Sequence, residues 1–265
     1  ADKYNLRTDD EEHARVRTPF MLSKRESLGS NNESRSTRWM AFAKQHSAFG
    51  FEKLSTADLP QMSHKIHGIS LLFEKVRGWR VPKSLLKDLS EGNCEVTMHL
   101  SLSLFHMTSS TFFGTTWSST TVSLNDVKVS DTLDLDCLDT IYITSRIIDP
   151  TCVGIVEIVA TRVDKTTNLA TAQYGCGWAM LSLFDQHRLQ DISEGYNLTS
   201  TTTATFYKGS PRDILELSLH HKLLDSKISL QEVNGCILNF KLFSNRRLLG
   251  ISSIIAENAI YGKHD

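Results

Sequence analysis

Long apolar runs are absent from the sequence. No segment approaches the roughly 18 to 20 consecutive apolar residues that a membrane-spanning helix needs, and charged residues stand at the N-terminus, where a secretory signal would be apolar. Net charge is also nearly absent, since 29 Lys and Arg face 30 Asp and Glu. Such a chain has no general attraction for phosphate backbones or anionic lipids. We therefore expect a soluble protein that does not bind nucleic acid, while local basic patches leave membrane contact open.

Cysteine is scarce, and no two cysteines have the spacing of a local site. The five lie far apart, mostly within apolar segments: Cys94, Cys137, Cys152, Cys176 and Cys236. Without a CxxC pair, neither a zinc knuckle nor a thioredoxin-type site forms locally. Buried, reduced thiols are the expected state, which favours a reducing intracellular compartment.

Motifs of catalysis and cofactor binding are missing as well. The histidines form no HExxH arrangement, and there is no GxSxG elbow, P-loop or GxGxxG fingerprint. The segment around Cys176 resembles the flanks of a papain-type nucleophile, but Gly177 stands where that pattern has an aromatic residue. We therefore predict a non-enzymatic protein with no cofactor and no metal site, and keep a cysteine hydrolase centred on Cys176 as the enzymatic alternative.

The acidic segment 131–139 suggests calcium at first sight. Calcium binds six to eight oxygens, which a flexible loop usually supplies. Leucines alternate with the acids here, however, which favours a strand that displays Asp134 and Asp136 to solvent. An acidic strand edge of this kind also discourages edge-to-edge aggregation.

The chain divides into four segments by residue pattern. Residues 1–37 are polar, with little periodic hydrophobicity, and predict a disordered or draped tail. Residues 38–64 favour a short amphipathic helix and a linker, residues 65–245 carry the main domain, and residues 246–265 predict a C-terminal strand or extension. Because the chain begins at Ala1 rather than methionine, we expect it to be a piece of a longer protein.

Alternation with a period of two residues predicts an all-β fold. Between Cys94 and Leu104 apolar residues occupy every second position, which predicts a half-buried strand with one face toward solvent. Similar runs, separated by polar turns, follow at 140–147, 153–163, 172–184, 202–206, 235–243 and 248–256. Long crossover helices are missing, so this spacing favours an antiparallel β-sandwich. Pro211 and the leucines behind it predict a short helical insertion at about 211–224.

Four aromatic residues are candidates for either core packing or partner binding. Phe112, Phe113 and Trp117 come directly after the best-defined strand, and Trp79 lies among several basic residues. Large aromatic side chains fill the cores of sandwiches, but they also form the hot spots of protein interfaces. The sequence leaves both roles open, and Trp79 or Trp117 could also anchor the module at a lipid interface.

Several short motifs follow one another in a defined order between about residues 66 and 243. They are Leu104-Phe105-His106, Phe112-Phe113-Gly114-Thr115-Thr116-Trp117, Val156-Glu157-Ile158-Val159-Ala160, Cys176-Gly177-Trp178, Leu181-Ser182-Leu183-Phe184, Phe206-Tyr207-Lys208-Gly209-Ser210-Pro211-Arg212 and Asn234-Gly235-Cys236-Ile237-Leu238. This order resembles the N-terminal region of the nephrocystin-4 family of ciliary scaffold proteins. The ends of the chain have no counterpart, and Trp178 stands where the family has a smaller aromatic residue, so the resemblance also admits a diverged ciliary paralogue.

The resemblance implies a C2-like β-sandwich that acts as a scaffold without enzymatic activity. It implies nephrocystin-1 and the retinitis pigmentosa GTPase regulator-interacting protein as partners in the transition zone, or the tubulin lattice and axonemal proteins for a diverged paralogue. Through its motif it adds Arg212 to the candidate partner-binding residues Phe112, Phe113, Trp117 and Trp79.

Two further expectations accompany this reading. The location is the cytoplasm and cytoskeleton, at the transition zone, basal body or axoneme of a cilium, with partners held by the sandwich surface and by the tail. A peripheral membrane-binding module of the C2 type is the alternative function.

Overall fold

Antiparallel β-strands make up most of the described chain. The computed structural model describes residues 15–17, 59–90, 93–124, 132–184, 201–209, 211 and 231–262. Its strands are β1 (Arg15–Arg17), β2 (Met62–Arg80), β3 (Cys94–His106), β4 (Thr111–Ser118), β5 (Val122–Ser123), β6 (Thr132–Ile147), β7 (Cys152–Asp164), β8 (Ala170–Ser182), β9 (Thr202–Tyr207), β10 (Glu232–Ser244) and β11 (Ile260–Tyr261). The predicted all-β fold is therefore confirmed.

Two short helices accompany the strands of the described part, α2 (Lys83–Ser90) and the 3-10 helix η3 (Arg246–Ile251). Helix α2 was not predicted from the residue pattern, although Pro82 stands directly before its first turn. Its Leu85 is buried in the core, and Leu86 and Leu89 pack against that core. In the part of the chain that the structure describes, no helix has the length and apolar character needed to cross a membrane.

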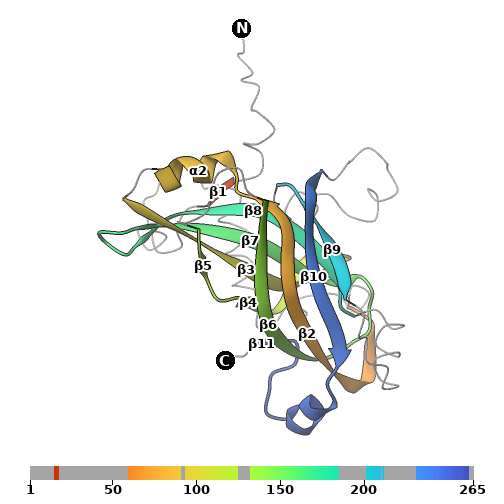
Figure 1. Cartoon of the computed structure of the whole chain (residues 1–265). Helices are drawn as coiled ribbons and strands as arrows, with labels where there is room; N and C mark the ends of the chain where they lie inside the picture. Colours follow the sequence, from red (N-terminus) through yellow and green to blue (C-terminus); the bar gives the residue numbers. More distant parts are fainter. Residues whose placement is uncertain are drawn as a thin grey trace, which may run out of the picture.

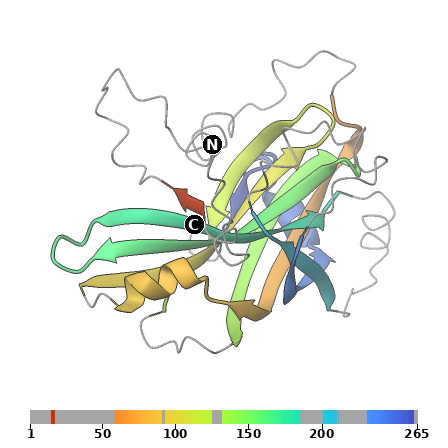
Figure 2. The same cartoon turned by 90° about the horizontal axis from the view of Figure 1, so that it is seen from above.

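The strands form one strongly curved sheet. Its order is β11-β6-β2-β10-β9-β8-β7-β3-β4, while β1 pairs with β8 and β5 pairs with β3. Figure 1 shows β6, β2 and β10 running side by side across one side of the molecule, with β3, β7 and β8 crossing behind them. The view from above shows the β7–β8 hairpin projecting beside β3 and α2 (Figure 2). The C2-like arrangement expected from the resemblance stays a prediction.

One hydrophobic core fills the inside of the curve. The apolar residues of β3 from Val96 to Leu104 all point into it, as the alternation predicted. The facing strands contribute rows of their own, including Ile69, Leu71 and Phe73 of β2, Ile141 and Ile143 of β6, and Leu238, Phe240 and Leu242 of β10. Each such side chain contributes about 1.5–3 kcal/mol when it is buried. This shared core therefore holds the two sides of the sheet against each other.

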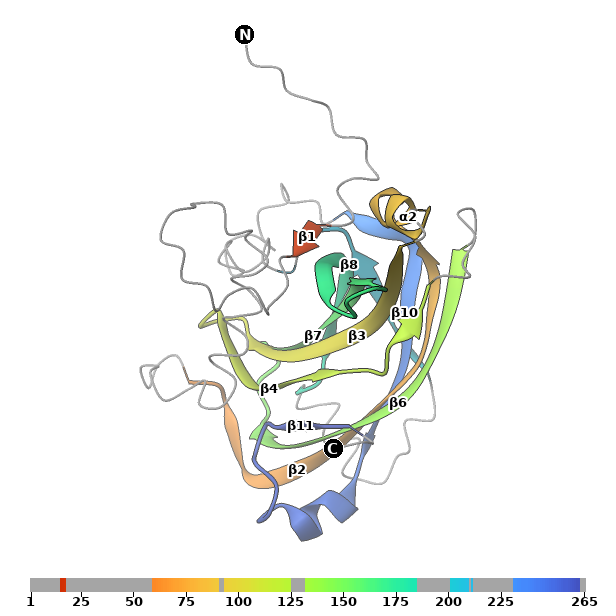
Figure 3. The same ribbon diagram turned by 90° about the vertical axis from the view of Figure 1, so that its left-hand side faces the viewer.

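The two ends of the sheet meet at a seam between β4 and β11 (Figure 3). The Ile260 N–H donates a hydrogen bond to the Thr115 Oγ1 at 2.7 Å, and the Thr115 hydroxyl donates to the Ile260 carbonyl oxygen at 3.4 Å. At Gly114, with φ of 67°, a Cβ atom would lie 1.9 Å from the carbonyl oxygen of Asn258. Glycine is therefore required at position 114, where the two chain segments approach closely. The hydrogen bonds of the Thr115 side chain link β4 to β11, so the sheet is nearly closed.

The outer face of β3 is more buried than the sequence predicted. Ser101 and Ser103 are buried, and the Ser103 Oγ lies 3.0 Å from the Thr116 Oγ1. The reason is a second apolar cluster on that face, made of Phe105, Phe112, Val153, Ile155 and Trp178. The C-terminal half of β3 is therefore covered on both faces.

The predicted strand at 248–256 is wrong. The segment begins with the 3-10 helix η3 and continues in turns until β11 pairs with β6. The Asn245 side chain accepts a hydrogen bond from the Arg247 N–H at 3.1 Å, which caps the first turn. Local capping thus overrides the apolar pattern that suggested a strand.

Two other predictions fall mainly on residues that are not described. The predicted helix at 39–51 lies outside the described residues, and of the predicted insertion at 211–224 only Pro211 lies within them. Of the predicted tail, residues 15–17 are described, and they form β1.

Candidate interaction surface

The structure buries four of the five residues that the sequence singled out for partner binding. Phe112, Phe113, Trp117 and Trp79 are 2%, 2%, 8% and 1% exposed. Arg212 lies outside the described residues. Burial favours the packing role for the four aromatic side chains, and partner binding by this set stays a prediction.

Each buried aromatic residue has a defined packing partner. Phe112 lies 4.9 Å from Phe105, and Trp117 lies 5.8 Å from Phe73, between ring centroids. The Trp79 Nε1–H donates a hydrogen bond to the Cys176 carbonyl oxygen at 3.4 Å inside the core. The contacts of Trp117 and Trp79 join strands from opposite sides of the sheet, whereas Phe112 packs against the neighbouring strand β3. Phe113 lies 6.0 Å from Phe184 between ring centroids. All four side chains therefore contribute to packing.

Among the described residues, three exposed aliphatic side chains lie close together in sequence on the segment that follows β10. We call Leu249, Ile251 and Ile254 the apolar knob, and they are 43%, 44% and 82% exposed. Figures 1 and 3 show η3 projecting from the end of the β2 and β10 strands. An exposed group of large aliphatic side chains is typical of a surface that a partner covers.

The apolar knob stands on a well-anchored base. The Asn245 N–H donates to the Gly68 carbonyl oxygen at 2.9 Å, and the Asn245 Nδ2 donates to the Ser70 Oγ at 3.0 Å. Leu248 is buried against β2, and a Cβ at Gly68 would lie 3.0 Å from the Leu248 Cβ. Beyond the knob, the Asn258 N–H donates to the Thr144 carbonyl oxygen at 2.7 Å. The knob is therefore held at both ends, so a partner would meet a pre-organised surface.

Among the described residues, two arginines precede the apolar knob in the sequence. Arg246 and Arg247 are exposed at the start of η3. The nearby carboxylate of Glu257 is paired with Arg146, whose Nη2 lies 3.0 Å from the Glu257 Oε2. A partner with an apolar recess and acidic residues around it would complement this surface.

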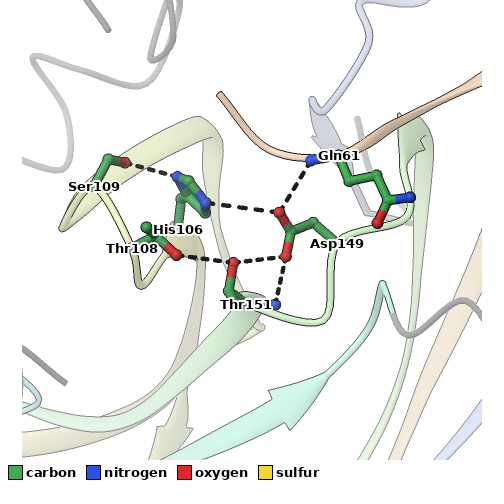
Figure 4. Close-up of polar contacts among 6 residues, drawn as sticks. All are labelled: Gln61, His106, Thr108, Ser109, Asp149 and Thr151. Atoms are coloured by element: carbon green, nitrogen blue, oxygen red, sulfur yellow. Dashed lines mark hydrogen bonds and ion pairs between the residues drawn. The ribbon is translucent and has the colours of Figure 1, made fainter. Parts of the chain in front are cut away.

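A polar cluster ties three loops together at the end of the sheet (Figure 4). Its centre is Asp149, in the turn between β6 and β7. The Asp149 Oδ2 accepts a hydrogen bond from the Gln61 N–H at 3.0 Å, and the Oδ1 accepts from the Thr151 N–H at 2.8 Å and from the Thr151 hydroxyl at 2.6 Å. His106, at the end of β3, lies with its Nε2 3.9 Å from the Asp149 Oδ2 and its Nδ1 2.7 Å from the Ser109 Oγ.

The residue types of this cluster match those of a Ser-His-Asp hydrolase triad, but the geometry does not. In a triad the carboxylate accepts a hydrogen bond from the imidazole and so fixes its tautomer. Here the His106–Asp149 distance of 3.9 Å is too long for a hydrogen bond. Both Asp149 oxygens already accept from Gln61 or Thr151, and His106 is only 2% exposed. The cluster therefore serves as a structural tie between the loops.

Asp149 should make the stability of this tie depend on pH. Burial raises the pKa of the Asp149 carboxyl, but hydrogen bonds from Thr151 and Gln61 and the charge of His106 outweigh it, so the pKa lies below its ordinary value. A lowered folded-state pKa stabilises the protein above the unfolded pKa of about 3.9, and this stabilisation is lost as the pH falls through the folded value.

We predict that Asp149→Asn lowers the free energy of unfolding by about 1–2 kcal/mol at pH 7, because the amide nitrogen cannot accept the hydrogen bonds that one carboxylate oxygen accepts now. Urea unfolding from pH 7 down to pH 3 would measure this, and the difference from the wild type should shrink below about pH 4. Asp136→Asn is the control, because Asp136 is exposed and, among the described residues, its carboxylate is paired with Lys75 at 3.6 Å. A constant difference across this pH range would contradict the assignment.

The predicted acidic strand is confirmed in β6. Asp134 and Asp136 are exposed, and the Lys75 Nζ lies 3.3 Å and 3.6 Å from their carboxylates. The Gly78 N–H donates to the Asp134 Oδ1 at 3.2 Å, and this hydrogen bond, followed by the pairing with Lys75, lowers the pKa of Asp134 against a smaller opposing effect of burial. Among the described residues, no group of three or more His, Cys, Asp or Glu side chains could hold a metal ion.

The five cysteines lie in the sheet without a disulfide. Burial raises the pKa of Cys137 to about 11 and that of Cys236 to about 12, which keeps both thiols protonated at neutral pH. Cys176 is 2% exposed, and its thiol donates to the Tyr174 carbonyl oxygen at 3.6 Å. This position within the core does not suit the nucleophile of a hydrolase.

The chain is similar to Nephrocystin-4 of Xenopus laevis, with 28% identity over 196 residues. The matched part is 73% of this chain and 13% of the relative, so the chain corresponds to a small part of that protein's length. No protein-family model matches the chain.

Proposed function

We propose that this chain is a non-enzymatic protein-interaction module of a ciliary scaffold. The observation that carries the proposal is the similarity to Nephrocystin-4 over 196 residues, which is 73% of this chain. The motif order noted in the sequence runs through β3, β4, β7, β8, β9 and β10 of this sheet. Phe112, Phe113, Trp117 and Trp79 are buried, so we look for the interaction site among the exposed side chains.

The apolar knob is the surface that we assign to partner binding. Leu249, Ile251 and Ile254 are exposed on a well-anchored segment, with Arg246 and Arg247 beside them. Aliphatic side chains with a positive margin fit an apolar recess edged with acids. The candidate partners are nephrocystin-1 and the retinitis pigmentosa GTPase regulator-interacting protein, in the transition zone. A diverged paralogue would instead bind tubulin or axonemal proteins, and the N-terminal segment is a second candidate contact.

Expression of the tagged full chain in ciliated cells tests this function. We expect the chain at the ciliary base or along the axoneme, and co-precipitation of the two candidate partners if it acts at the transition zone. We predict that the triple variant Leu249→Ser, Ile251→Ser, Ile254→Ser lowers partner recovery about tenfold or more, the effect of losing a small interface hot spot.

The matched control is the single variant Leu169→Ser. Leu169 is an exposed aliphatic residue in the β7–β8 turn, away from the knob. It should leave partner recovery unchanged. Absence of the wild-type chain from cilia would count against the ciliary assignment, whereas equal recovery with both variants would count only against the knob.

A peripheral membrane module is the second candidate, because exposed Ile254 and the exposed Arg246 and Arg247 of the same segment also suit a lipid interface. Co-sedimentation with anionic vesicles, with and without Ca²⁺, separates the two functions. Strong vesicle binding that the triple variant abolishes would favour the membrane.

A further inference from the structure

Strand β8 has one edge that is only partly covered. Its other edge pairs with β7 over almost the whole strand, from Val153↔Ser182 to Val163↔Ala170. On the remaining edge β9 meets β8 at a single pair, Trp178↔Tyr207. In the described part of the chain, the other strand on this edge is β1.

A distortion at Gly177 separates the two parts of this edge. Gly177 has φ of 138°, a conformation that residues with a side chain rarely adopt. On the neighbouring strand β7, the pairing register with β8 shifts between Glu157 and Val159, the positions that face this part of β8. Such a bulge redirects a strand and ends its pairing. Beyond Gly177, toward Ala170, β9 no longer accompanies β8. The edge from Ala170 to Gly175 is thereby left for another strand.

The present occupant of this edge is short. β1 pairs antiparallel with β8 over three positions, Arg15↔Gly175, Val16↔Tyr174 and Arg17↔Gln173. The β8 residues Ala170 to Ala172 have no strand partner on this edge among the described residues. A ladder of three residues contributes few main-chain hydrogen bonds, so a longer strand that also covered these positions would bind more strongly.

The register sets the chemistry of a suitable strand. Directly paired residues share one face of a sheet, and Tyr174 belongs to the core cluster. A ligand residue opposite Tyr174 therefore lies on the core side and should be apolar. A neighbour opposite Gln173, which is only partly buried, lies on the other face and can be polar. The sequence Arg15-Val16-Arg17 follows this alternation.

We propose that the β8 edge from Ala170 to Gly175 is an acceptor site for an extended strand of a partner protein, and that β1 occupies this site in cis. The partner strand alternates polar and apolar residues and replaces β1 by the same antiparallel pairing. The site is distinct from the apolar knob and does not depend on which assembly the module joins.

The test uses the purified full chain and a fluorescein-labelled synthetic peptide with the sequence of residues 11–20. The variant Arg15→Pro, Val16→Pro opens the site: successive residues of a strand direct their N–H groups to opposite sides, so one proline removes a donor to β8 in either case. The control is Arg15→Lys, Val16→Ile, which keeps the backbone and the alternation.

We expect the peptide to bind the double-proline variant at least about tenfold more tightly than the wild type or the control, in which β1 competes for the edge. Hydrogen exchange at residues 173–175 should rise in the variant and fall again when the peptide is added. A peptide with prolines at the two central positions should not bind.

Two results would overturn the proposal. One is equal peptide binding to all three chains, or unchanged exchange at residues 173–175 in the variant. The other is loss of the cooperative unfolding transition in the double-proline variant, since β1 would then be an essential strand and not an exchangeable one. Neither result bears on the ciliary function, because no ciliary protein takes part.

Discussion

Replacing Gly114 by alanine is expected to destabilise the protein by about 3–5 kcal/mol, a size that single substitutions reach only through a specific structural defect. Gly114 has φ of 67°, which costs a residue with a Cβ about 1–2 kcal/mol. The new Cβ would lie 1.9 Å from the Asn258 carbonyl oxygen, so β4 must move away from the chain before β11. That movement breaks the hydrogen bonds between Thr115 and Ile260, each worth about 1 kcal/mol.

Denaturant unfolding of the purified chain measures this effect as a shift of the midpoint. Gly250→Ala is the matched control, because a Cβ at Gly250 meets nothing within 4 Å and Gly250 lies in η3. Its stability should stay within about 0.5 kcal/mol of the wild type. If both alanine variants were equally stable, the seam between β4 and β11 would not contribute to the fold.

Trp79→Ala is the second substitution for which we expect a loss of about 3–5 kcal/mol, the usual range for removing a large buried aromatic side chain. The Trp79 ring is 1% exposed in the core, and its Nε1–H reaches the Cys176 carbonyl oxygen across the molecule. Alanine would leave a cavity and would remove this hydrogen bond. Trp79→Phe should cost less, because it keeps most of the apolar area and loses only the hydrogen bond.

The same variants separate the two roles that the sequence left open for Trp79. A packing role predicts that Trp79→Ala lowers the unfolding midpoint and that partner recovery falls only as the folded fraction falls. Leu169→Ala, at a side chain that is 57% exposed, serves as the control and should change neither. A Trp79→Ala chain of normal stability that no longer bound its partners would instead support the interface role.

The strands were largely predictable because their alternation is local. The segment from Cys94 to Leu104 forms most of β3, and its apolar residues point inward as expected. The outer face was not predictable in the same way. Ser101 and Ser103 are polar, yet they are buried because Phe105 and Trp178 form a cluster on that side. The spacing of residues along a strand does not show which polar residues will be buried by contacts with other strands.

The candidate surface was harder to predict than the fold. The leucines and isoleucines from Leu248 to Ile255 resemble a strand, but the Asn245 cap turns the chain into η3 and exposes three of them as the knob. The polar cluster brings together His106, at the end of β3, and Asp149, in the turn between β6 and β7. Because these residues are far apart in the sequence, no local motif predicts the cluster. The strand in the acidic segment was predictable because Leu133 and Leu135 alternate with Asp134 and Asp136 at the period of a strand.

The position of β2 in the sheet order has a consequence for how the chain is made. β2 (Met62–Arg80) lies between β6 and β10, and its partner β10 (Glu232–Ser244) is synthesised more than 150 residues later. During synthesis β3 can pair with β4, and β7 with β8, as neighbours along the chain, whereas the edge of β2 that faces β10 stays unpaired until β10 is made. Pairings of this separation form slowly, and an open edge invites aggregation. We therefore expect this edge of β2 to stay open to aggregation until residues 232–244 have been made.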